Sequence, residues 1–335
     1  MNVLSLFDGL SCGMIALERA EIIVDNYFAA EIDKHAIKVS KHNYPQIKHI
    51  GDVCKISYKD GILKTEVGDF QVGKIDMLIG GSPCQSLSNL GDGSGLDGKS
   101  GLFYQYLRIK KEIESENKNL KFLLENVVGK KEGILEISKL MEVEEVLFNS
   151  NLVSAQNRAR YYWTNIPFDL PKDRKLIVKD ILEEGIPDDS ILTPGRAKWV
   201  VSESGQQCFK KRYAVLDPEK ANCLTARSDA SWNSNYVTRY GQITRLTPIE
   251  YERLQTVPDG YTSIASRSER YKMLGNGWTV DVIAHILKGI YQEEICDSDN
   301  QLYRIGFVDM MDTSKANTKE KSHEIHKTCS DSYRQ

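Results

Sequence analysis

The chain has 335 residues, of which 41% are hydrophobic and 27% are charged, and its formal net charge at pH 7 is −3. These values are typical of globular proteins and exclude fibrous or largely disordered chains. No apolar run reaches the ~18 residues that cross a bilayer, and the N-terminus lacks a basic leader, so we expect a cytoplasmic protein.

The first 150 residues alternate short apolar runs with helical patterns, which predicts an α/β fold with a mostly parallel sheet covered by helices. Helical spacing is found at 13–20, 35–43, 103–115 and 133–141. The expected strands are 3–7, 27–31, 75–79, 122–124, 143–148 and, at the end of this unit, 153–163.

The sequence pattern changes after Pro167, where prolines and scattered aromatic residues replace the regular alternation of apolar runs and helical patterns. Regular pattern resumes at Thr247, a helix N-cap followed by Pro248 and, three residues after the cap, Glu250. A last apolar helix is expected at 280–290. We therefore predict a large lobe from residues 1–165 plus 265–296, a smaller lobe from 166–264, and a polar tail from 297–335.

Cysteine spacing and the local distribution of charge limit the kinds of site that we expect in this chain. The seven cysteines are widely spaced, odd in number and without a Cys-x-x-Cys pair, so neither a disulfide framework nor a metal site is expected. From Ser190 to Lys272 there are 13 Lys plus Arg against 8 Asp plus Glu, interleaved with Trp and Tyr. Such a segment suits phosphate contact and base stacking, although a solvated polar surface explains it equally well.

A glycine-rich turn follows the first expected strand, at Phe7-Asp8-Gly9-Leu10-Ser11-Cys12-Gly13, and Glu31 ends the second strand 22 residues after Gly9. This layout indicates nucleotide-type binding, with the carboxylate accepting bonds from ribose hydroxyls. The incomplete G-x-G-x-x-G pattern favours a small adenosine-bearing cofactor over a pyrophosphate. Asp52 is expected at the same sheet edge. The alternative is an ordinary turn of an α/β domain.

Residues 93–100, Gly-Ser-Gly-Leu-Asp-Gly-Lys-Ser, fit the P-loop pattern letter for letter. A P-loop joins a strand directly to a helix, whereas here the expected strand ends at Ile79, well before Gly93. We interpret the segment as a lid rather than a phosphate site.

Three features predict one reactive site. Cys84 follows Gly80-Gly81-Ser82-Pro83 at the end of an apolar strand, where a thiol would lie at the ligand-binding edge of the sheet. Glu125 ends a second apolar strand at the same edge and could hold or donate a proton. Arg158 and Arg160 project from one face of a strand. Thiol, acid and paired arginines suit attack on an electron-poor ring.

In this order the sequence motifs resemble those of the DNA (cytosine-5) methyltransferases. The residues within the motifs are most similar to those of phage-type enzymes and partly to those of the animal de novo enzymes. The resemblance spans residues 3 to about 290 and departs at Ser11-Cys12 and Thr256-Val257-Pro258. The matching stretches are Phe7-Asp8-Gly9, Glu31, Asp52, Gly81-Ser82-Pro83-Cys84-Gln85, Glu125-Asn126-Val127, Gln156-Asn157-Arg158-Ala159-Arg160, Arg245-Leu246-Thr247-Pro248 through Gln255, and Gly275-Asn276-Gly277.

This resemblance implies a Rossmann-like, S-adenosyl-L-methionine-dependent fold and methyl transfer to cytosine C5 in duplex DNA. Cys84 would add to C6 of a flipped-out cytosine, Glu125 would protonate N3 and Arg160 would hold O2, with Arg158 near a phosphate or loop. The cofactor residues implied are Phe7, Gly9, Cys12, Gly13, Glu31, Ile32, Asp52, Val53, Pro83, Asn276 and Trp278. The 166–264 lobe would read the sequence, with DNA contacts expected from Gln85, Ser88, Arg227, Trp232, Asn233, Asn235 and Arg239.

Two alternatives remain open. The same apparatus serves RNA cytosine-5 methyltransferases that act on transfer RNA, and a catalytically silent DNA-binding subunit could share the fold. We also expect a monomer, with a companion restriction endonuclease as a possible partner.

Overall fold

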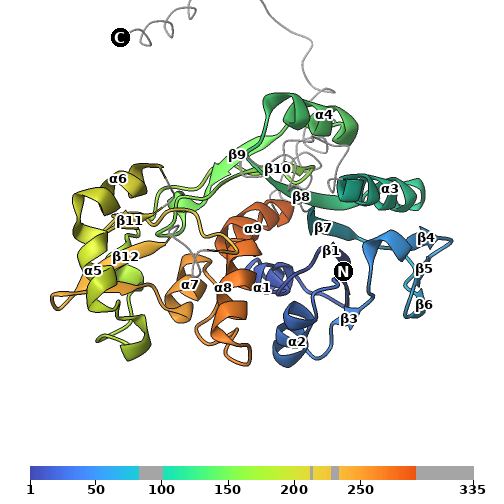
Figure 1. Cartoon of the computed structure of the whole chain (residues 1–335). Coiled ribbons are helices and arrows are strands. Elements are labelled where there is room, and N and C mark those ends of the chain that lie inside the picture. Colours follow the sequence, from blue (N-terminus) through green and yellow to red (C-terminus); the bar gives the residue numbers. More distant parts are fainter. Residues whose placement is uncertain (83–100, 212–213, 228–233, 292–335) are drawn as a thin grey trace, which may run out of the picture. The chain divides into compact units, whose positions relative to one another are not determined.

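The structure, a computed structural model, describes residues 1–82, 101–211, 214–227 and 234–291. Residues 1–290 form one compact unit (Figure 1). A second unit begins at Tyr291, which is the part of it that is described.

A seven-stranded sheet with the spatial order β3-β2-β1-β7-β8-β10-β9 forms the centre of the first unit. The first five strands in that order run parallel, and β10 is antiparallel to both of its neighbours. The chain order reverses between β1 and β7, which is where open α/β sheets bind ligands. The strands are β1 (Asn2–Leu6), β2 (Asn26–Ala30), β3 (Lys48–His49), β7 (Met77–Gly81), β8 (Lys121–Val127), β9 (Val146–Asn149) and β10 (Ala159–Thr164).

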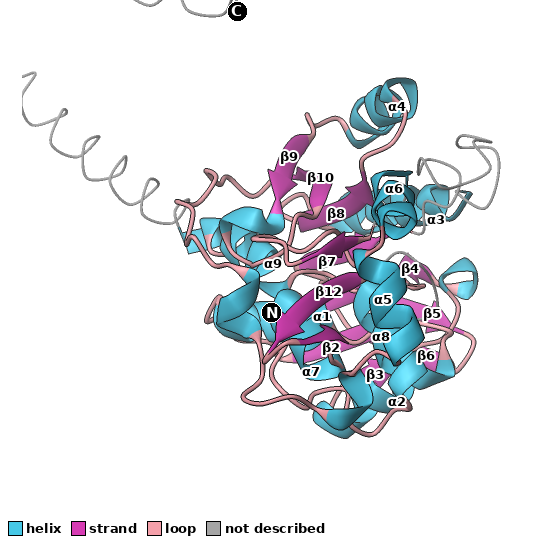
Figure 2. Cartoon of the chain, turned by 60° about the vertical axis from the view of Figure 1, so that its left-hand side comes forward, coloured by secondary structure: helices cyan, strands magenta, loops and turns pink. Residues whose placement is uncertain are grey.

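Helices cover both faces of this sheet (Figures 1 and 2). Side chains of a strand alternate between faces, so Val3 belongs to one buried core and Leu4 and Leu6 to another. The Val3 core includes α1 (Cys12–Arg19), α2 (Lys34–Asn43) and α9 (Val280–Leu287). The Leu4 core includes α3 (Gly101–Glu116) and α4 (Lys131–Met141). Helices therefore cover both faces of the sheet, and the ends of the strands are the places where a ligand can reach it.

The predicted α/β fold is confirmed, and most expected elements are found within a few residues of their predicted bounds. The expected strand at 153–163 is wrong in its first half, since β10 begins only at Ala159. Residues 153–158 follow the 3-10 helix η3 (Ser150–Leu152) and form no named strand, and the side chains of Ser154 and Gln156 donate to the carbonyl of Leu254.

Sequence reasoning missed a small antiparallel sheet of β4 (Ser57–Lys59), β5 (Ile62–Thr65) and β6 (Gly68–Gln71), which follows the 3-10 helix η1 (Val53–Lys55). Its strands of three or four residues are too short to show an apolar alternation. The carboxylates of Glu112 and Glu116 on α3 accept backbone hydrogen bonds from Tyr58, Asp60 and Gly61, which tie this sheet to the main layer.

Residues 166–290 add shorter elements. Leu192, Val200, Phe209, Ala214 and Tyr236 form a small separate core inside the predicted 166–264 lobe, whose boundaries stay a prediction. The Thr247 capping box with Glu250 forms as predicted and starts α7. The elements are η4 (Val178–Ile181), η5 (Asp188–Ser190), α5 (Pro194–Val201), α6 (Glu203–Lys211), β11 (Val215–Leu216), β12 (Asn235–Arg239), β13 (Gln242–Arg245), α7 (Pro248–Leu254) and α8 (Arg267–Asn276).

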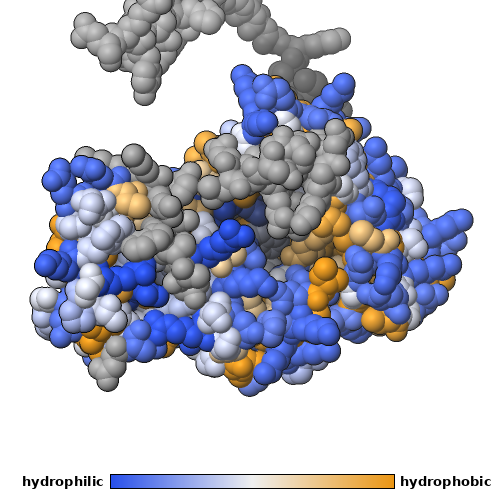
Figure 3. All heavy atoms as spheres, in the orientation of Figure 1, coloured by the Kyte–Doolittle hydropathy of each residue, from blue (hydrophilic) through white to orange (hydrophobic). Residues whose placement is uncertain are grey.

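Hydrophilic residues dominate the described surface on the face drawn in Figure 3, with apolar residues in small groups between them. Within the described part of the chain, every helix is too short or too polar to span a membrane.

Candidate functional site

A cavity of about 800 Å³ lies at the carboxyl ends of β1, β2, β7 and β8, the predicted ligand-binding edge of the sheet, where the strand order reverses. Its walls also come from β10, from the segment 223–226 and from the end of α8. Seven predicted cofactor residues line it, together with Glu125, Arg158 and Arg160 from the predicted reactive site. These cofactor residues are Phe7, Gly9, Cys12, Glu31, Ile32, Asn276 and Trp278.

Glu31 has the geometry of a ribose-binding carboxylate. Its Oε2 accepts a hydrogen bond from the Gly9 amide at 2.8 Å, and its Oε1 accepts from the amides of Ile32 and Asp33 at 2.8 and 2.7 Å. These bonds fix the carboxylate at the mouth of the cavity. A carboxylate oxygen has two lone pairs, so Oε2 can still accept a bond from a ligand hydroxyl.

The turn after β1 forms the neighbouring part of the cavity wall. Phe7 has a φ of +59°, a left-handed conformation that a bulky residue rarely adopts and that is common at functional sites. Gly13 lies within α1 and not in the lining, and a side chain there would come within 2.5 Å of Ile79 and 2.7 Å of Tyr27. Its role is therefore close packing, which brings α1 against the sheet and leaves room for a ligand at the turn.

Two predicted cofactor residues lie elsewhere. Asp52 uses its carboxylate to accept a hydrogen bond from Cys54 N at 2.9 Å, which caps η1, and Val53 is buried in the core beside β1. Neither lines the cavity. The turn between β5 and β6 is the reason for this local order, because Glu66 bonds to Asp52 N and to Lys55. Cofactor contacts from Asp52 and Val53 therefore stay a prediction.

The remaining lining fits an adenosine-bearing cofactor. Phe7 and Trp278 supply aromatic surface, Glu31 supplies the hydroxyl acceptor, and the volume suits a molecule of that size. Cys12 is 3% exposed, and burial raises the pKa of its thiol to about 12, so it is a neutral wall residue rather than a nucleophile.

A buried polar network begins at Asp8, a lining residue that sequence reasoning missed. Its carboxylate, on a residue 8% exposed, accepts hydrogen bonds from Ser11 Oγ at 2.5 Å and from Tyr27 Oη at 2.6 Å. Burial raises the pKa of Asp8 to about 6, against the opposing effect of these hydrogen bonds. Burial therefore makes Asp8 a weaker acid than an exposed aspartate.

We expect Asp8→Asn to alter the pH dependence of stability. The folded chain binds the Asp8 proton up to about pH 6, whereas the unfolded chain releases it near 3.8. This contribution to the free energy of unfolding therefore falls as pH rises through that window, by about 3 kcal/mol. Urea denaturation should show the variant gaining that amount relative to wild type between pH 4 and pH 7. Asp69→Asn, at an exposed site on β6, is the control; an unchanged difference for Asp8→Asn would contradict the expectation.

Glu125 is held from two sides at the inner end of the cavity. Arg160 Nε lies 2.9 Å from Glu125 Oε1, and Trp278 Nε1 donates to Glu125 Oε2 at 3.1 Å. Gly81 is paired with Glu125 in the sheet register, and a side chain at 81 would approach Glu125 Oε2 to 2.9 Å. Glycine at the end of β7 thus leaves the carboxylate facing the cavity, beside the point where the chain continues toward Cys84.

Arg158 has a structural role in the wall of the cavity. It is 5% exposed, and its guanidinium donates to the backbone carbonyls of Leu224, Gly275 and Gly277 at 2.9, 3.3 and 2.9 Å. These bonds join β10 to two other walls of the cavity. The expectation placed Arg158 near a phosphate or a loop. Its donors bond to carbonyls of the segments at 224 and 275–277, which agrees with the loop and not with a phosphate contact.

The predicted DNA contacts divide into three groups. Asn235 is 2% exposed and exchanges hydrogen bonds with the Asn222 backbone, and Arg239 is 5% exposed and paired with buried Glu250 at 2.6 Å. Burial makes both predictions wrong. Arg227 is exposed, and its DNA contact stays a prediction. Pro83, Cys84, Gln85, Ser88, Trp232 and Asn233, like the P-loop-like stretch 93–100, lie outside the described residues.

The basic segment 190–272 also has fewer positive charges available for contact with DNA phosphates than its composition indicates. At least six of its 13 basic side chains form ion pairs within the chain, so much of its charge is compensated locally. These pairs are Lys220–Asp173, Arg239–Glu250, Arg253–Asp259, Arg267–Asp189, Arg270–Glu252 and Lys272–Asp33.

Several lining residues escaped sequence reasoning, among them Asp33, Lys272 and Cys223. Lys272 Nζ on α8 lies 3.0 Å from Asp33 Oδ2, so this pair bridges two walls at the mouth of the cavity. No local motif marks these positions, since the chain brings them together only on folding.

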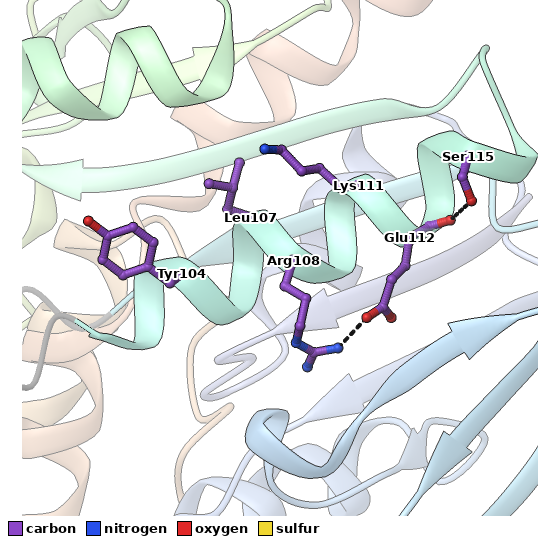
Figure 4. A pocket seen from close by; sticks show the side chains of 6 residues that line it. All are labelled: Tyr104, Leu107, Arg108, Lys111, Glu112 and Ser115. Atoms are coloured by element: carbon purple, nitrogen blue, oxygen red, sulfur yellow. Dashed lines mark hydrogen bonds and ion pairs between the residues drawn. The ribbon is translucent and has the colours of Figure 1, made fainter.

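A second hollow lies on the surface of α3 and is lined by that helix alone (Figure 4). Its charged pair, Arg108 and Glu112, is 2.6 Å apart and is an ordinary i,i+4 helix pair. This hollow has neither backbone donors nor an apolar floor from another element, so the cavity at the sheet edge is the candidate site.

The fold and the cavity define an α/β enzyme that binds an adenosine-bearing cofactor next to a glutamate–arginine pair. Residues 1–172 and 172–292 match the family model described as C-5 cytosine-specific DNA methylase, and the chain belongs to this family. Its cofactor is S-adenosyl-L-methionine, as predicted.

Named relatives agree with this assignment. The chain is 28% identical to the type II methyltransferase M1.ScrFI of Lactococcus lactis subsp. cremoris, over 84% of this chain and 76% of that protein. It is also 28% identical to the type II methyltransferase M.NlaX of Neisseria lactamica, over 85% and 94%. A solved structure of a Spodoptera frugiperda DNMT2 mutant matches the fold with a TM-score of 0.63 at 20% identity, over 87% of this chain and 99% of that one.

Proposed function

We propose that this protein transfers a methyl group to C5 of cytosine within a specific sequence of double-stranded DNA, through a transient bond between the Cys84 sulfur and C6. The observation that supports it best is the position of Glu125, held by Arg160 and Trp278 and paired in register with Gly81. Cys84 follows Gly81 by three residues, a length of chain that spans at most about 11 Å.

The chemistry assigns a role to each group. The Cys84 thiolate adds to C6 of a flipped-out cytosine, and Glu125 provides the proton that N3 takes up. The bound cofactor supplies an electrophilic methyl group. Arg160, whose remaining N–H groups can face the cavity, holds the cytosine O2. Once C5 has bonded to that methyl group, loss of the C5 proton to water and departure of the Cys84 sulfur as a thiolate restore the aromatic ring, and Glu125 takes back the N3 proton.

DNA is the proposed substrate because the matched family is described as a cytosine-specific DNA methylase. The 166–264 lobe would read the sequence, with Arg227, Trp232 and Asn233 as remaining candidates. The names of the type II methyltransferase relatives also favour a companion restriction endonuclease as a partner. Transfer RNA is the alternative substrate.

The proposal is tested by trapping. Duplex DNA with 5-fluorocytosine at the target blocks loss of the group at C5, so the protein should remain covalently attached when the methyl donor is present. Cys84→Ser should bind the cofactor normally and give neither adduct nor product. The target sequence is first found by bisulfite sequencing of DNA from cells that express the chain.

Parallel incubations with labelled S-adenosyl-L-methionine and either DNA or transfer RNA separate the substrates. Label found only in RNA would overturn the DNA assignment. Label in DNA without an adduct on the fluorinated duplex would overturn the covalent mechanism, and no label in either would favour a silent DNA-binding subunit.

A further inference from the structure

The sulfur of Cys223 contacts two arginines, Arg160 on β10 and Arg158 immediately before it. Arg158 Nη1 donates to Cys223 Sγ at 3.3 Å, and Arg160 Nη2 donates to the same atom at 3.7 Å. Cys223 also lines the cavity together with Glu125. The mechanism above makes no use of this thiol, although it touches the arginine that we expect to hold the target base.

The backbone around Cys223 is fixed against residues 155–157, the segment that leads into Arg158 and β10. Ala221 N donates to Ala155 O, and Asn157 N donates to Ala221 O, both at 2.8 Å. Leu224 N donates to the buried Gln156 side chain, again at 2.8 Å. Because hydrogen bonds hold the chain on both sides of residue 223, the position of its sulfur is set by the fold.

Electrostatics explains why a sulfur suits this position. Burial and the charge of Arg160 lower the pKa of Arg158, which shows the cost of placing two guanidiniums in one buried site. Although burial alone would raise the pKa of the Cys223 thiol, the two arginines lower it below its usual value. The sulfur therefore offers an acceptor to both guanidiniums, in addition to the Glu125 carboxylate that pairs with Arg160.

Arg160 is consequently held at three of its nitrogens. Its Nε contacts Glu125 Oε1 at 2.9 Å, its Nη1 donates to Ala159 O at 2.8 Å, and its Nη2 donates to Cys223 Sγ. A guanidinium carries five N–H groups, so two remain for a ligand in the cavity. The sulfur contact limits rotation of the end of the side chain that would meet the base.

We propose that Cys223 is a positioning residue: its sulfur accepts hydrogen bonds from Arg158 and Arg160 and keeps the Arg160 guanidinium in the orientation that serves both Glu125 and the target base. This inference rests on the proposed methyl transfer for its catalytic consequence, whereas the contact between Arg160 and the sulfur can be tested without turnover.

The test compares two substitutions in the full chain. Cys223→Val fills the space of the thiol with a somewhat larger apolar side chain and removes the acceptor, whereas Cys223→Ser keeps an acceptor and loses volume. We expect kcat to fall about tenfold to a hundredfold in Cys223→Val and to stay within about threefold of wild type in Cys223→Ser. KM for S-adenosyl-L-methionine should change by less than about twofold in both. Cys208→Val, on α6 and outside the cavity lining, is the matched control.

If Cys223 served only in packing, kcat would be higher in Cys223→Val than in Cys223→Ser, the opposite of the order that we expect. That order, wild-type kcat in Cys223→Val, or equal losses in both variants would overturn the proposal.

The contact itself is measured by alkylation of Cys223 with iodoacetamide as a function of pH, in a Cys84→Ser chain and with peptide-level mass spectrometry. Arg160→Gln should move the alkylation curve of Cys223 to higher pH, while Arg108→Gln on α3 should leave it in place. An unmoved curve in Arg160→Gln would refute the contact even if the enzyme methylates DNA. A shifted curve in a chain without methyltransferase activity would support the contact and refute the proposed function.

Discussion

The Glu125→Gln chain is expected to lose methyl transfer by a factor of about 10² to 10⁴ in kcat, the usual contribution of a positioned general acid or base. Glutamine has the same shape and can still accept a hydrogen bond from Trp278 or Arg160, but it cannot supply the proton that cytosine N3 needs. Without that proton, negative charge accumulates on the ring as the Cys84 sulfur adds. The measurement is the initial rate of label transfer to target DNA at saturating cofactor.

Cofactor binding separates this effect from damage to the fold. Glu125 lies at the inner end of the cavity, away from the Glu31 turn, so the dissociation constant for S-adenosyl-L-methionine in isothermal titration should stay within about twofold of wild type. Glu132→Gln, at an exposed position of α4, serves as the matched control. A Glu125→Gln chain with nearly full kcat would remove Glu125 from the mechanism.

The sheet was predictable because its signal is local. Val3, Leu4 and Leu6 alternate between two faces that are both buried, and the apolar runs at β7 and β8 continue without interruption. A strand buried on both faces has little freedom to be anything else. Phe7, Glu31 and Glu125 then followed from one rule, that ligand-binding residues of an open α/β sheet come at the carboxyl ends of strands.

Burial of individual polar residues was not predictable. Asn235 and Arg239 have the side chains that read DNA bases, yet Asn235 completes the hydrogen bonds of Asn222, and Arg239 pairs with Glu250 at a site from which water is excluded. Glu250 also closes the capping box of α7, so the helix start and the ion pair share one carboxylate. Residue type alone does not distinguish a base contact from such an internal partner.

The part of the cavity wall that comes from residues after 220 was predictable only through the family resemblance. Trp278 and Asn276 were assigned by the motif at 275–277, whereas Cys223 and Lys272, which have no such motif, were missed. Sequence separation explains the difference: Trp278 and Glu125 are 153 residues apart, and their contact arises from packing of the C-terminal segment against β8.

Arg158→Met should lower the free energy of unfolding by about 3 kcal/mol or more, because it removes the Arg158 donor from the carbonyls of Leu224, Gly275 and Gly277, the last of which keeps a bond from Gln255 Nε2. Methionine fills most of the volume, so the loss reports hydrogen bonding rather than a cavity. Urea denaturation, with the slope checked for two-state behaviour, measures the effect. Arg158→Lys, which keeps the charge but offers a single nitrogen, should lose an intermediate amount.

This outcome distinguishes a structural arginine from a DNA-binding one. If Arg158 only met a phosphate, its loss would weaken DNA binding and leave stability unchanged, as expected for Arg227→Met at its exposed position, where the change should stay within about 0.5 kcal/mol. Because Arg158 joins β10 to the 223–226 segment and to the end of α8, its removal should also widen the cavity and weaken cofactor binding. Stability equal to wild type in Arg158→Met would show that the three carbonyls find other partners, and the cavity walls would then be held by Gln156 and the backbone bonds beside it.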